Sequence, residues 1–398
     1  MGHWTDSDVV IVSAARTPIG KFLGSLSPLS AIDLGAAAVR EVTRRARIEP
    51  ALVDEVLMGN VVPAGEGQAP ARQAAIRGGL PPTVGATTLN KVCGSGLKAV
   101  MWAAQQVRAG DAQIVVAGGM ESMSNAPYLL PRARTGYRLG NASLVDAVIH
   151  DGLWCAFEDH HMGEAAEFIA EQYQVSLHQL DEYALGSHRK AVAATASGAF
   201  AAEIVPVAVP GSKAQKALVE KDECPRPDTS LEALAALKPA FRPGGRVTAG
   251  NSPGLTDGAA AVIVMSGRRA RELDCRPLAR ITGYAQAAVE PRWLFIAPAY
   301  AIRTLLKRTG LALGDFDLLE VNEAFAAQIL ADGKELGWNW ERLNVRGGGI
   351  ALGHPIGASG ARVLVTLLYA LHQLGKATGL AALCLGGGEA VAMSVEMV

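Results

Sequence analysis

The chain has 398 residues, of which 49% are hydrophobic and 19% charged, and its formal net charge is −1. This composition is typical of a soluble globular enzyme of two or three domains, and it excludes binding to nucleic acid through a global basic field. The five cysteines are widely spaced without a Cys-x-x-Cys pair. We therefore expect neither a disulfide framework nor a metal site, and we expect a reducing compartment.

Targeting signals are not evident in the sequence. No apolar stretch reaches the ~18 residues that a membrane span needs, and the first eight residues lack the basic and apolar regions of a secretory signal. The last residues do not form a peroxisomal tripeptide. We therefore expect a cytoplasmic protein that contacts neither membrane nor nucleic acid.

Strands and helices alternate in the first 121 residues. The hydrophobic patterns predict strands over 9–14, 53–59 and 114–117 and helices over 32–45, 70–78 and 97–107. Ser30 is a candidate N-cap for the first helix, and Gly118-Gly119 is expected to close the third strand. This alternation indicates an α/β fold with a central sheet.

Residues 122–249 differ in character because they are rich in proline and irregular polar loops, with predicted helices over 163–173 and 177–197. From residue 250 the sequence again resembles the first segment, with strand-like runs bounded by glycine, and 257–265 is predicted as a helix or a strand. We therefore expect an inserted loop domain over 122–249 within a first half formed by residues 1–121 and 250–275.

The last segment, residues 276–398, resembles a copy of the first half. Gly94-Ser95-Gly96, an apolar helix, a glycine, a strand and a Gly-Gly turn recur as Ala358-Ser359-Gly360 followed by the same series. Order and spacing agree over ~30 residues, as an internal duplication requires. Two equivalent halves place two helix N-termini near one centre, where both can direct N–H groups at one site.

Cys93 is the first candidate for chemistry. It precedes Gly-Ser-Gly and an apolar helical pattern, which places the thiol at a strand-to-helix turn. The partial positive charge of a helix N-terminus predicts a lowered thiol pKa and a reactive thiolate. The alternative is a buried structural cysteine, a common role for this residue type.

Three further residues have the right chemistry to act with Cys93. His354 lies in a stiff turn between Gly353 and Pro355 and can accept a thiol proton, or it is a surface histidine. Cys384 ends a buried strand beside a glycine turn and is either a second acid-base thiol or a core cysteine. Asn322 follows a strand and is either functional or a simple helix N-cap.

Four blocks of the sequence together resemble the signature motifs of the thiolase family. They are Cys93-Gly94-Ser95-Gly96, Asn322-Glu323-Ala324-Phe325, Gly353-His354-Pro355-Ile356-Gly357-Ala358-Ser359-Gly360 and Cys384-Leu385-Gly386-Gly387-Gly388. The resemblance covers essentially the whole chain. It implies a duplicated five-layer αβαβα fold with an inserted loop domain, which agrees with the organisation predicted above.

The resemblance also implies a catalytic mechanism. Cys93 would accept the acyl group as a thioester, His354 would activate it, and Cys384 would exchange the α-proton. Asn322 would hold a water that forms one oxyanion hole with His354, while the backbone N–H groups of Cys93 and Gly386 would form the other. Coenzyme A and acetyl-CoA are then substrates, and no cofactor is permanently bound. The implied coenzyme A contacts are His161, Met162, Arg226, Phe241, Ala249, Ala324 and Phe325.

The expected activity is that of an acetyl-CoA C-acetyltransferase, an acyltransferase of fatty acid metabolism that forms a homo-oligomer, either a dimer or a tetramer. The alternatives are a degradative 3-ketoacyl-CoA thiolase for longer chains and a non-catalytic coenzyme A-binding protein. Two departures from the family bear on this choice. Pro253 stands where a serine is frequent, unless Ser252 substitutes for it, and Leu294–Pro298 replaces a segment that often carries Met and Gly.

Overall fold

A mixed β-sheet built from two similar halves runs through the computed structural model, which describes residues 3–210 and 216–398. The first half has the order β1 (Val9–Arg16), β12 (Thr256–Ser266), β5 (Ile114–Ser122), β3 (Glu55–Gly59) and β4 (Gly85–Leu89), and β2 (Gly20–Lys21) pairs with β12. The second half has the order β13 (Ala279–Ala288), β16 (Glu389–Met397), β15 (Thr378–Leu385) and β14 (Leu318–Val321).

The strand directions confirm the predicted duplication. In the first half β1–β12 and β12–β5 are antiparallel and β5–β3 is parallel. In the second half β13–β16 and β16–β15 are antiparallel and β15–β14 is parallel. The halves join where Val10 pairs with Arg280 and Ile11 with Ala279. Each half therefore repeats one topology. Residues 257–265, for which the sequence allowed either a helix or a strand, belong to the strand β12.

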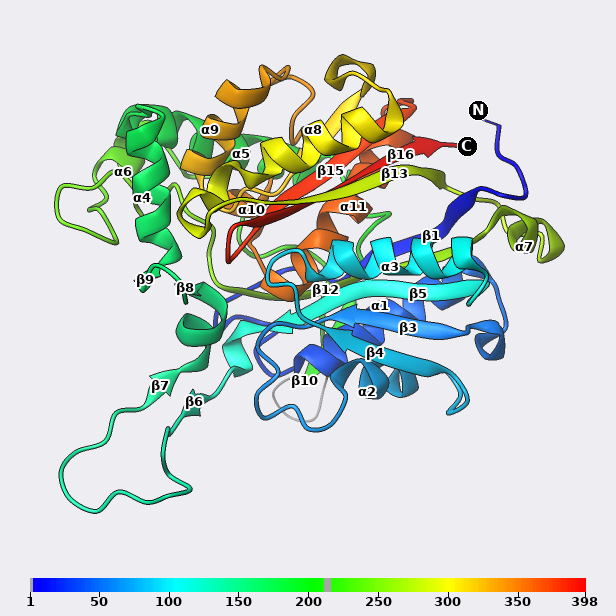
Figure 1. The fold of residues 1–398 in the computed structure, drawn as a ribbon, viewed down its shortest axis with the longest axis horizontal. Coiled ribbons are helices and arrows are strands. Elements are labelled where there is room, and N and C mark those ends of the chain that lie inside the picture. Colours follow the sequence, from blue (N-terminus) through cyan, green and yellow to red (C-terminus); the bar gives the residue numbers. More distant parts are fainter. Residues whose placement is uncertain (1–2, 211–215) are drawn as a thin grey trace.

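Helices complete five layers (Figure 1). The outer face of the first half carries α1 (Ala31–Ala46) and α2 (Pro70–Arg77), and α8 (Ala297–Thr309) and α9 (Ala326–Leu336) lie outside the second half. Between the halves lie α3 (Ser95–Ala109) and α11 (Ile356–Gln373). Short helices α7 (Gly267–Glu272) and α10 (Gly349–Leu352) complete these halves. Ser30 caps α1 as predicted, in a capping box with Asp33.

The central helices α3 and α11 approach one another through glycine. A Cβ atom added to Gly96 would lie 2.7 Å from the Ala361 backbone nitrogen, and one added to Gly360 would lie 2.5 Å from that of Leu97. The contact is reciprocal, because each glycine faces the residue that follows its counterpart. The N-terminal ends of both helices are thereby held side by side, as the duplication predicted.

One predicted boundary is wrong. Gly118-Gly119 does not close a strand, because β5 continues to Ser122 and pairs with β12 along its whole length. The glycines are needed inside the strand, since a Cβ atom on Gly119 would collide with the carbonyl oxygen of Gly357 at the start of α11. The close approach of α11 therefore explains Gly119, whereas Gly118 lies against the carbonyl oxygen of Ala260 in β12.

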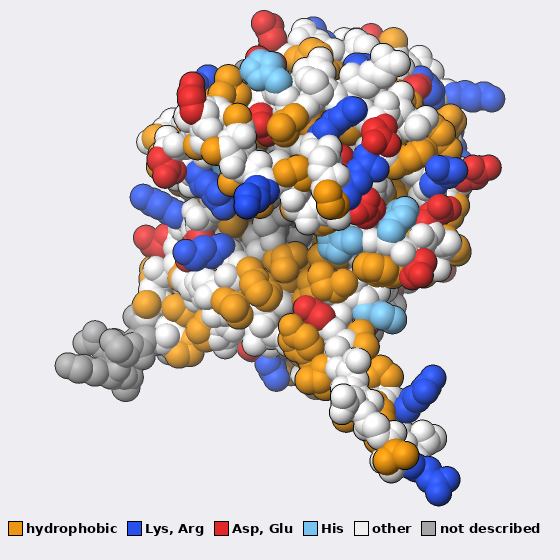
Figure 2. Space-filling view, turned by 90° about the vertical axis from the view of Figure 1, so that its left-hand side faces the viewer, with side chains coloured by type: hydrophobic (Ala, Val, Ile, Leu, Met, Phe, Trp, Pro, Cys, Tyr) orange, Lys and Arg blue, Asp and Glu red, His pale blue; other side chains and the backbone are white. Residues whose placement is uncertain are grey.

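The inserted segment forms helices α4 (Met162–Gln172), α5 (Leu177–Ala196) and α6 (Leu231–Ala235) and small hairpins. The hairpins are β6 (Tyr128–Leu129) with β7 (Val145–Asp146), β8 (Trp154–Cys155) with β9 (His160–His161), and β10 (Val207–Pro210) with β11 (Lys216–Val219). Residues 130–144, between β6 and β7, project from the body as an arm (Figure 1). Figure 2 shows hydrophobic side chains gathered across the middle of this side of the molecule, above the base of the arm.

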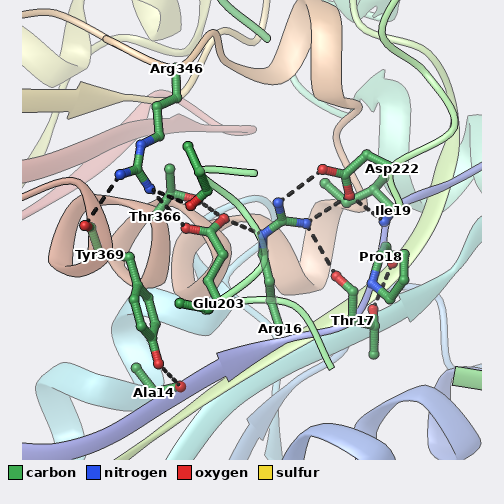
Figure 3. Close-up of polar contacts among 12 residues, drawn as sticks. Ala14, Arg16, Thr17, Pro18, Ile19, Glu203, Asp222, Arg346, Thr366 and Tyr369 are labelled. Carbon is green, nitrogen blue, oxygen red and sulfur yellow. Dashed lines mark hydrogen bonds and ion pairs between the residues drawn. The ribbon is translucent and has the colours of Figure 1, made fainter. Parts of the chain in front are cut away.

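A buried ion network ties the insertion to the sheet (Figure 3). Arg16, at the end of β1, donates from Nε to Glu203 at 2.6 Å and from Nη1 to Asp222 at 2.7 Å. Arg346 lies 3.5 Å from the other oxygen of Glu203. Because Arg16 and Glu203 have no exposed side-chain surface, the charges stabilise one another in a medium where an unpaired charge is costly.

Among the described residues no helix is long and apolar enough to cross a membrane.

Candidate active site

A cavity of about 390 Å³ opens where the inserted segment meets both halves of the sheet. Its wall is mostly apolar and includes every residue proposed for catalysis or coenzyme A binding except Asn322. The proposed residues in the wall are Cys93, His354, Cys384, Gly386, His161, Met162, Arg226, Phe241, Ala249, Ala324 and Phe325. The fold thus brings together side chains separated by up to 291 positions of sequence, from Cys93 to Cys384.

Cys93 lies in the turn between β4 and α3. The turn is held by Ser95, whose hydroxyl accepts from the Lys91 N–H at 2.8 Å and donates to the Val92 carbonyl at 2.6 Å. Val92 has a left-handed backbone with φ of 46°. Lys91 also forms an ion pair at 2.7 Å with Glu389 of the second half. This bracing places the Cys93 sulfur at the cavity wall.

The expectation of a lowered thiol pKa at Cys93 is wrong. Burial raises the pKa of the Cys93 thiol to about 12, although hydrogen bonds from the backbone of Gly386 and of Cys93 itself act in the opposite direction. Desolvation of the thiolate therefore outweighs the two backbone N–H groups that stabilise it. Cys93 is therefore a neutral thiol at rest, with the Gly386 N–H directed at its sulfur.

Cys384 is the penultimate residue of β15, with 2% of its surface exposed. Burial raises the pKa of its thiol well above the ordinary value, and a thiolate on Cys93 raises it further. The two sulfurs, one from each half, therefore influence each other electrostatically. Such a pair favours having at most one thiolate at a time.

His354 lies in the turn between α10 and α11, buried and facing the cavity. Its Nδ1 is 2.5 Å from the Ser359 hydroxyl, and its Nε2 is 3.5 Å from the Asn322 amide nitrogen. Burial and the nearby positive charge of Arg362 lower the pKa of His354 to about 3. The imidazole is thus neutral at physiological pH and is not the surface residue of the alternative reading.

Asn322 is not a helix cap, because α9 begins at Ala326 with Phe325 as its N-cap. Asn322 is fully buried behind His354, and its Oδ1 has no hydrogen-bond partner among the described residues. A buried amide oxygen without a partner is costly unless a ligand or water binds it. Asn322 therefore leaves an open acceptor position beside His354.

Glu323 connects the same strand end to the insertion. Its carboxylate accepts hydrogen bonds from Tyr183, Ser187, Asn344 and the Ile350 N–H, at 2.7 to 3.1 Å. These donors come from α5, α10 and the loop before α10. Glu323 is therefore a brace between the insertion and the second half.

The expected coenzyme A positions form one side of the cavity. The rings of His161 and Phe241 stack with centroids 4.9 Å apart, and Phe241 meets Phe325 edge to face at 6.1 Å. Arg226 contributes the only Lys or Arg side chain to the cavity wall within the described residues. A passage lined by flat apolar rings and one cation fits a slender chain that ends in phosphate.

Both departures from the family pattern lie in the cavity wall. Ser252 and Pro253 line it together, and the Ser252 hydroxyl donates to the Thr248 carbonyl at 2.7 Å, so it can only accept from a ligand. Leu294 and Phe295 also line it, and Phe295 packs edge to face on Phe325 at 5.4 Å. Two bulky side chains of the departing segment therefore form part of the cavity wall.

Two residues near the site had no assigned role in the sequence. Ser359 belongs to the sequence block that contains His354, and the only feature of the sequence that could have drawn attention to it is its place at the start of a predicted helix. Glu121 accepts from Asn60, the Val61 and Val62 N–H groups and the Gly357 N–H at 2.9 to 3.2 Å, which joins β5 to the start of α11. Burial raises the pKa of Glu121 to about 7 against the effect of these donors.

Comparison with known proteins agrees with this architecture. Residues 9–268 match the family model for the thiolase N-terminal domain, and residues 275–397 match that for the thiolase C-terminal domain. The chain is 54% identical over 388 residues to an acetyl-CoA acetyltransferase of Pseudomonas aeruginosa, covering 98% of this chain and 99% of the relative. It is 52% identical over 390 residues to that of Cupriavidus necator, with the same coverage.

A solved structure gives the same result. The crystal structure of the Bacillus anthracis acetyl-CoA acetyltransferase matches with a TM-score of 0.96 at 44% identity, covering 98% of this chain and 99% of that one. Two family models, curated relatives and a solved structure agree over both halves and the insertion. The chain therefore belongs to the thiolase family.

Proposed function

We propose that the protein is an acetyl-CoA C-acetyltransferase, which interconverts two acetyl-CoA with acetoacetyl-CoA and coenzyme A through an acetyl thioester on Cys93. The observation that carries this proposal is the meeting of two thiols, a neutral imidazole and the Gly386 N–H in one apolar cavity. The printed names of the relatives support acetyl-CoA as the substrate.

In the first half-reaction the Cys93 sulfur attacks the thioester carbonyl. The raised thiol pKa and the lowered imidazole pKa disfavour a resting thiolate–imidazolium pair, so the proton moves to His354 as the carbon–sulfur bond forms. His354 then protonates the departing coenzyme A sulfur. The N–H groups of Cys93 and Gly386 stabilise the tetrahedral oxyanion, and one such donor typically contributes roughly 3 to 4 kcal/mol.

In the second half-reaction the thiolate of Cys384, the minor form of this thiol because burial raises its pKa, removes an α-proton from another acetyl-CoA. The resulting carbanion bonds to the acetyl carbon on Cys93, and the Cys93 sulfur leaves as a thiolate that recovers the proton taken by Cys384. His354 and a water held by Asn322 stabilise the enolate oxygen. The unpartnered Asn322 Oδ1 supports a water at this place.

The cavity side formed by His161, Met162, Phe241, Ala249, Ala324 and Phe325 holds the pantetheine chain in this proposal, and Arg226 holds a phosphate. The loop domain is proposed to extend over 122–249, between 1–121 and 250–275, with a C-terminal half over 276–398. A homo-oligomer, either dimer or tetramer, a cytoplasmic location and a part in fatty acid metabolism remain proposals that follow from the family.

The proposal is tested by separating the two half-reactions. Cys384→Ala should still form an acetyl adduct on Cys93, detected by intact mass, but should lose condensation by at least ~100-fold because the base is missing. Cys93→Ala should lose both. Condensation by Cys384→Ala at the wild-type rate would contradict the assignment of the base, and absence of an acetyl adduct in the wild type would contradict the function.

The length of acyl chain that the protein accepts is tested by thiolysis of 3-ketoacyl-CoA substrates with four to sixteen acyl carbons. Because the bulky side chains of Leu294 and Phe295 line the cavity, we expect activity to be confined to the shortest substrate. An optimum at eight or more carbons would instead show a degradative thiolase for longer chains. Absence of turnover on every substrate would show a coenzyme A-binding protein without catalysis.

A further inference from the structure

We infer that His188 is a positioning residue for Arg226: it holds the backbone that carries this arginine and thereby sets the affinity for the phosphates of coenzyme A. The inference rests on the proposed function, in which Arg226 holds a phosphate, and deepens it by naming what orients that arginine. His188 lies in α5 and is 5% exposed. Its Nδ1 accepts a hydrogen bond from the backbone N–H of Arg226 at 3.2 Å.

Arg226 lies in a segment that has no regular structure of its own. Residues 220–230 connect β11 to α6 and form neither helix nor strand. Within the described residues the Arg226 guanidinium makes no hydrogen bond or ion pair, and its carbonyl accepts only a long bond of 3.5 Å, from the Thr229 N–H of the same segment. The bond to His188 is therefore the contact that ties the Arg226 backbone to another element of the fold.

The helix that carries His188 is firmly anchored. The preceding residue, Ser187, donates to the Glu323 carboxylate at 2.7 Å and accepts from the Gly348 N–H at 3.1 Å. Both partners belong to the second half of the fold, which also carries His354 and Cys384. Through α5, the position of Arg226 is thus referred to the half that supplies these two reacting groups.

The bond requires a neutral imidazole. A backbone N–H only donates, so Nδ1 of His188 carries no proton and the proton of the neutral ring is on Nε2. Burial and the positive charge of Arg226 lower the pKa of His188 to about 4, so the ring has this form at physiological pH. Arg226 therefore lies beside an uncharged acceptor that can hold its backbone without repelling its guanidinium.

Arg226 also lies where two cavities adjoin. A second cavity of about 440 Å³ is lined by both His188 and Arg226, and it shares Arg226, Ala249 and Ser252 with the cavity of the proposed site. A shift of the Arg226 backbone would move the cation relative to both spaces. We therefore expect loss of the His188 contact to weaken the binding of a phosphate and not to alter the reacting groups.

The inference is tested by thiolysis of acetoacetyl-CoA with coenzyme A as the second substrate. His188→Ala should raise KM for coenzyme A on the order of tenfold, because a charge-assisted hydrogen bond to phosphate is weakened. It should leave kcat within about twofold, since the phosphate contact is the same in the ground state and the transition state. An unchanged KM, or a loss confined to kcat, would overturn the inference.

Two comparisons separate this role from a general effect on the fold. In an Arg226→Ala background, His188→Ala should raise KM no further, because the ring acts only through that arginine. With acetoacetyl-pantetheine and pantetheine, which carry no phosphate, His188→Ala and the wild type should have equal KM values. Full additivity in the double variant, or an equal rise in KM with and without phosphates, would contradict the role of His188.

His188→Asn should restore the wild-type KM, because the Asn amide oxygen can take the place of Nδ1 as acceptor. His178→Ala is the matched control, since His178 also lies in α5 but its side chain is 69% exposed and contacts Glu182. A rise in KM as large in His178→Ala would overturn the inference. The two proposals fail separately: wild-type protein that acetylates Cys93, with a KM that His188→Ala leaves unchanged, contradicts only the role of His188, and protein that does not acetylate Cys93 contradicts the function.

Discussion

The two halves of the fold can be compared at the turns that begin their central helices. In the first half, the Ser95 hydroxyl bonds to backbone atoms of the turn, at Lys91 and Val92. In the second half, the Ser359 hydroxyl bonds to a side chain, the imidazole of His354. The helices themselves meet through Gly96 and Gly360 in a reciprocal contact.

The difference arises from spacing. Cys93 precedes Ser95 by two residues, whereas His354 precedes Ser359 by five. A hydroxyl in the first turn of a helix points back toward the preceding residues, so in the short turn it meets backbone and in the long turn it meets the imidazole. The same position in a duplicated fold thus secures the loop around Cys93 in one half and contacts the His354 imidazole in the other.

The largest expected effect is on the rate of Cys93 alkylation, which reports whether the thiol is protonated at rest. With the pKa of Cys93 near 12, the thiolate fraction should rise about tenfold per pH unit, or roughly 1000-fold from pH 7 to 10. Alkylation of Cys93 by iodoacetamide, followed by peptide mass spectrometry, should show this rise while circular dichroism stays constant.

The control for this titration is His354→Ala. If the two turns do not form a thiolate–imidazolium pair at rest, the variant should show the same slope as the wild type. A wild-type rate that levels off below pH 8, with a steep rise in the variant, would demonstrate such a pair and contradict the comparison.

Next in size is the effect of separating the helices. Gly96→Ala and Gly360→Ala each insert a methyl group against backbone of the other helix, and overpacking of this kind typically costs about 1–3 kcal/mol in the free energy of unfolding. Urea denaturation should give similar losses for the two variants, because the contact is reciprocal. Gly186→Ala is the control, since nothing lies near its added Cβ, and a loss in only one of the paired variants would contradict the pseudo-symmetry.

The smallest effect is expected from Ser95→Ala. Removing this hydroxyl leaves the Lys91 N–H without its acceptor, and a hydrogen bond of this type contributes about 1 kcal/mol to stability. Thermal unfolding should register that loss as a melting temperature below that of the wild type. An unchanged melting temperature in Ser95→Ala would contradict the contribution assigned to this hydroxyl.

Several features of the fold could be predicted from the sequence because they depend on local pattern. Ser30 has the N-cap signature of α1, and the apolar spacing after Cys93 marks α3. The internal match of residues 94–121 with 358–389 indicated the duplication that the strand directions confirm. The continuation of β5 through Gly118-Gly119 could not be predicted, because it depends on how closely α11 approaches, and its Gly357 lies 238 positions after Gly119 in the sequence.

The candidate site was predicted in part. The four motifs named Cys93, His354, Cys384 and Asn322, and the structure places the first three in one cavity wall with Asn322 behind it. The direction of the Cys93 pKa shift was predicted wrongly, because local sequence shows the helix N-terminus but not the degree of burial. The contacts of Ser359 and Glu121 were also absent from local pattern, since each depends on a partner presented by the folded chain.

What the sequence determined by itself is the chemistry and the repeat: two thiols, a histidine and an asparagine in four blocks, set on two copies of one strand-and-helix pattern. Tertiary structure alone decided the electrostatics and the orientation of those groups. Desolvation and hydrogen-bond direction depend on atoms that surround a side chain from distant parts of the chain. The neutral state of the Cys93 thiol and the contact of Ser359 with His354 therefore exist only once both halves are packed together.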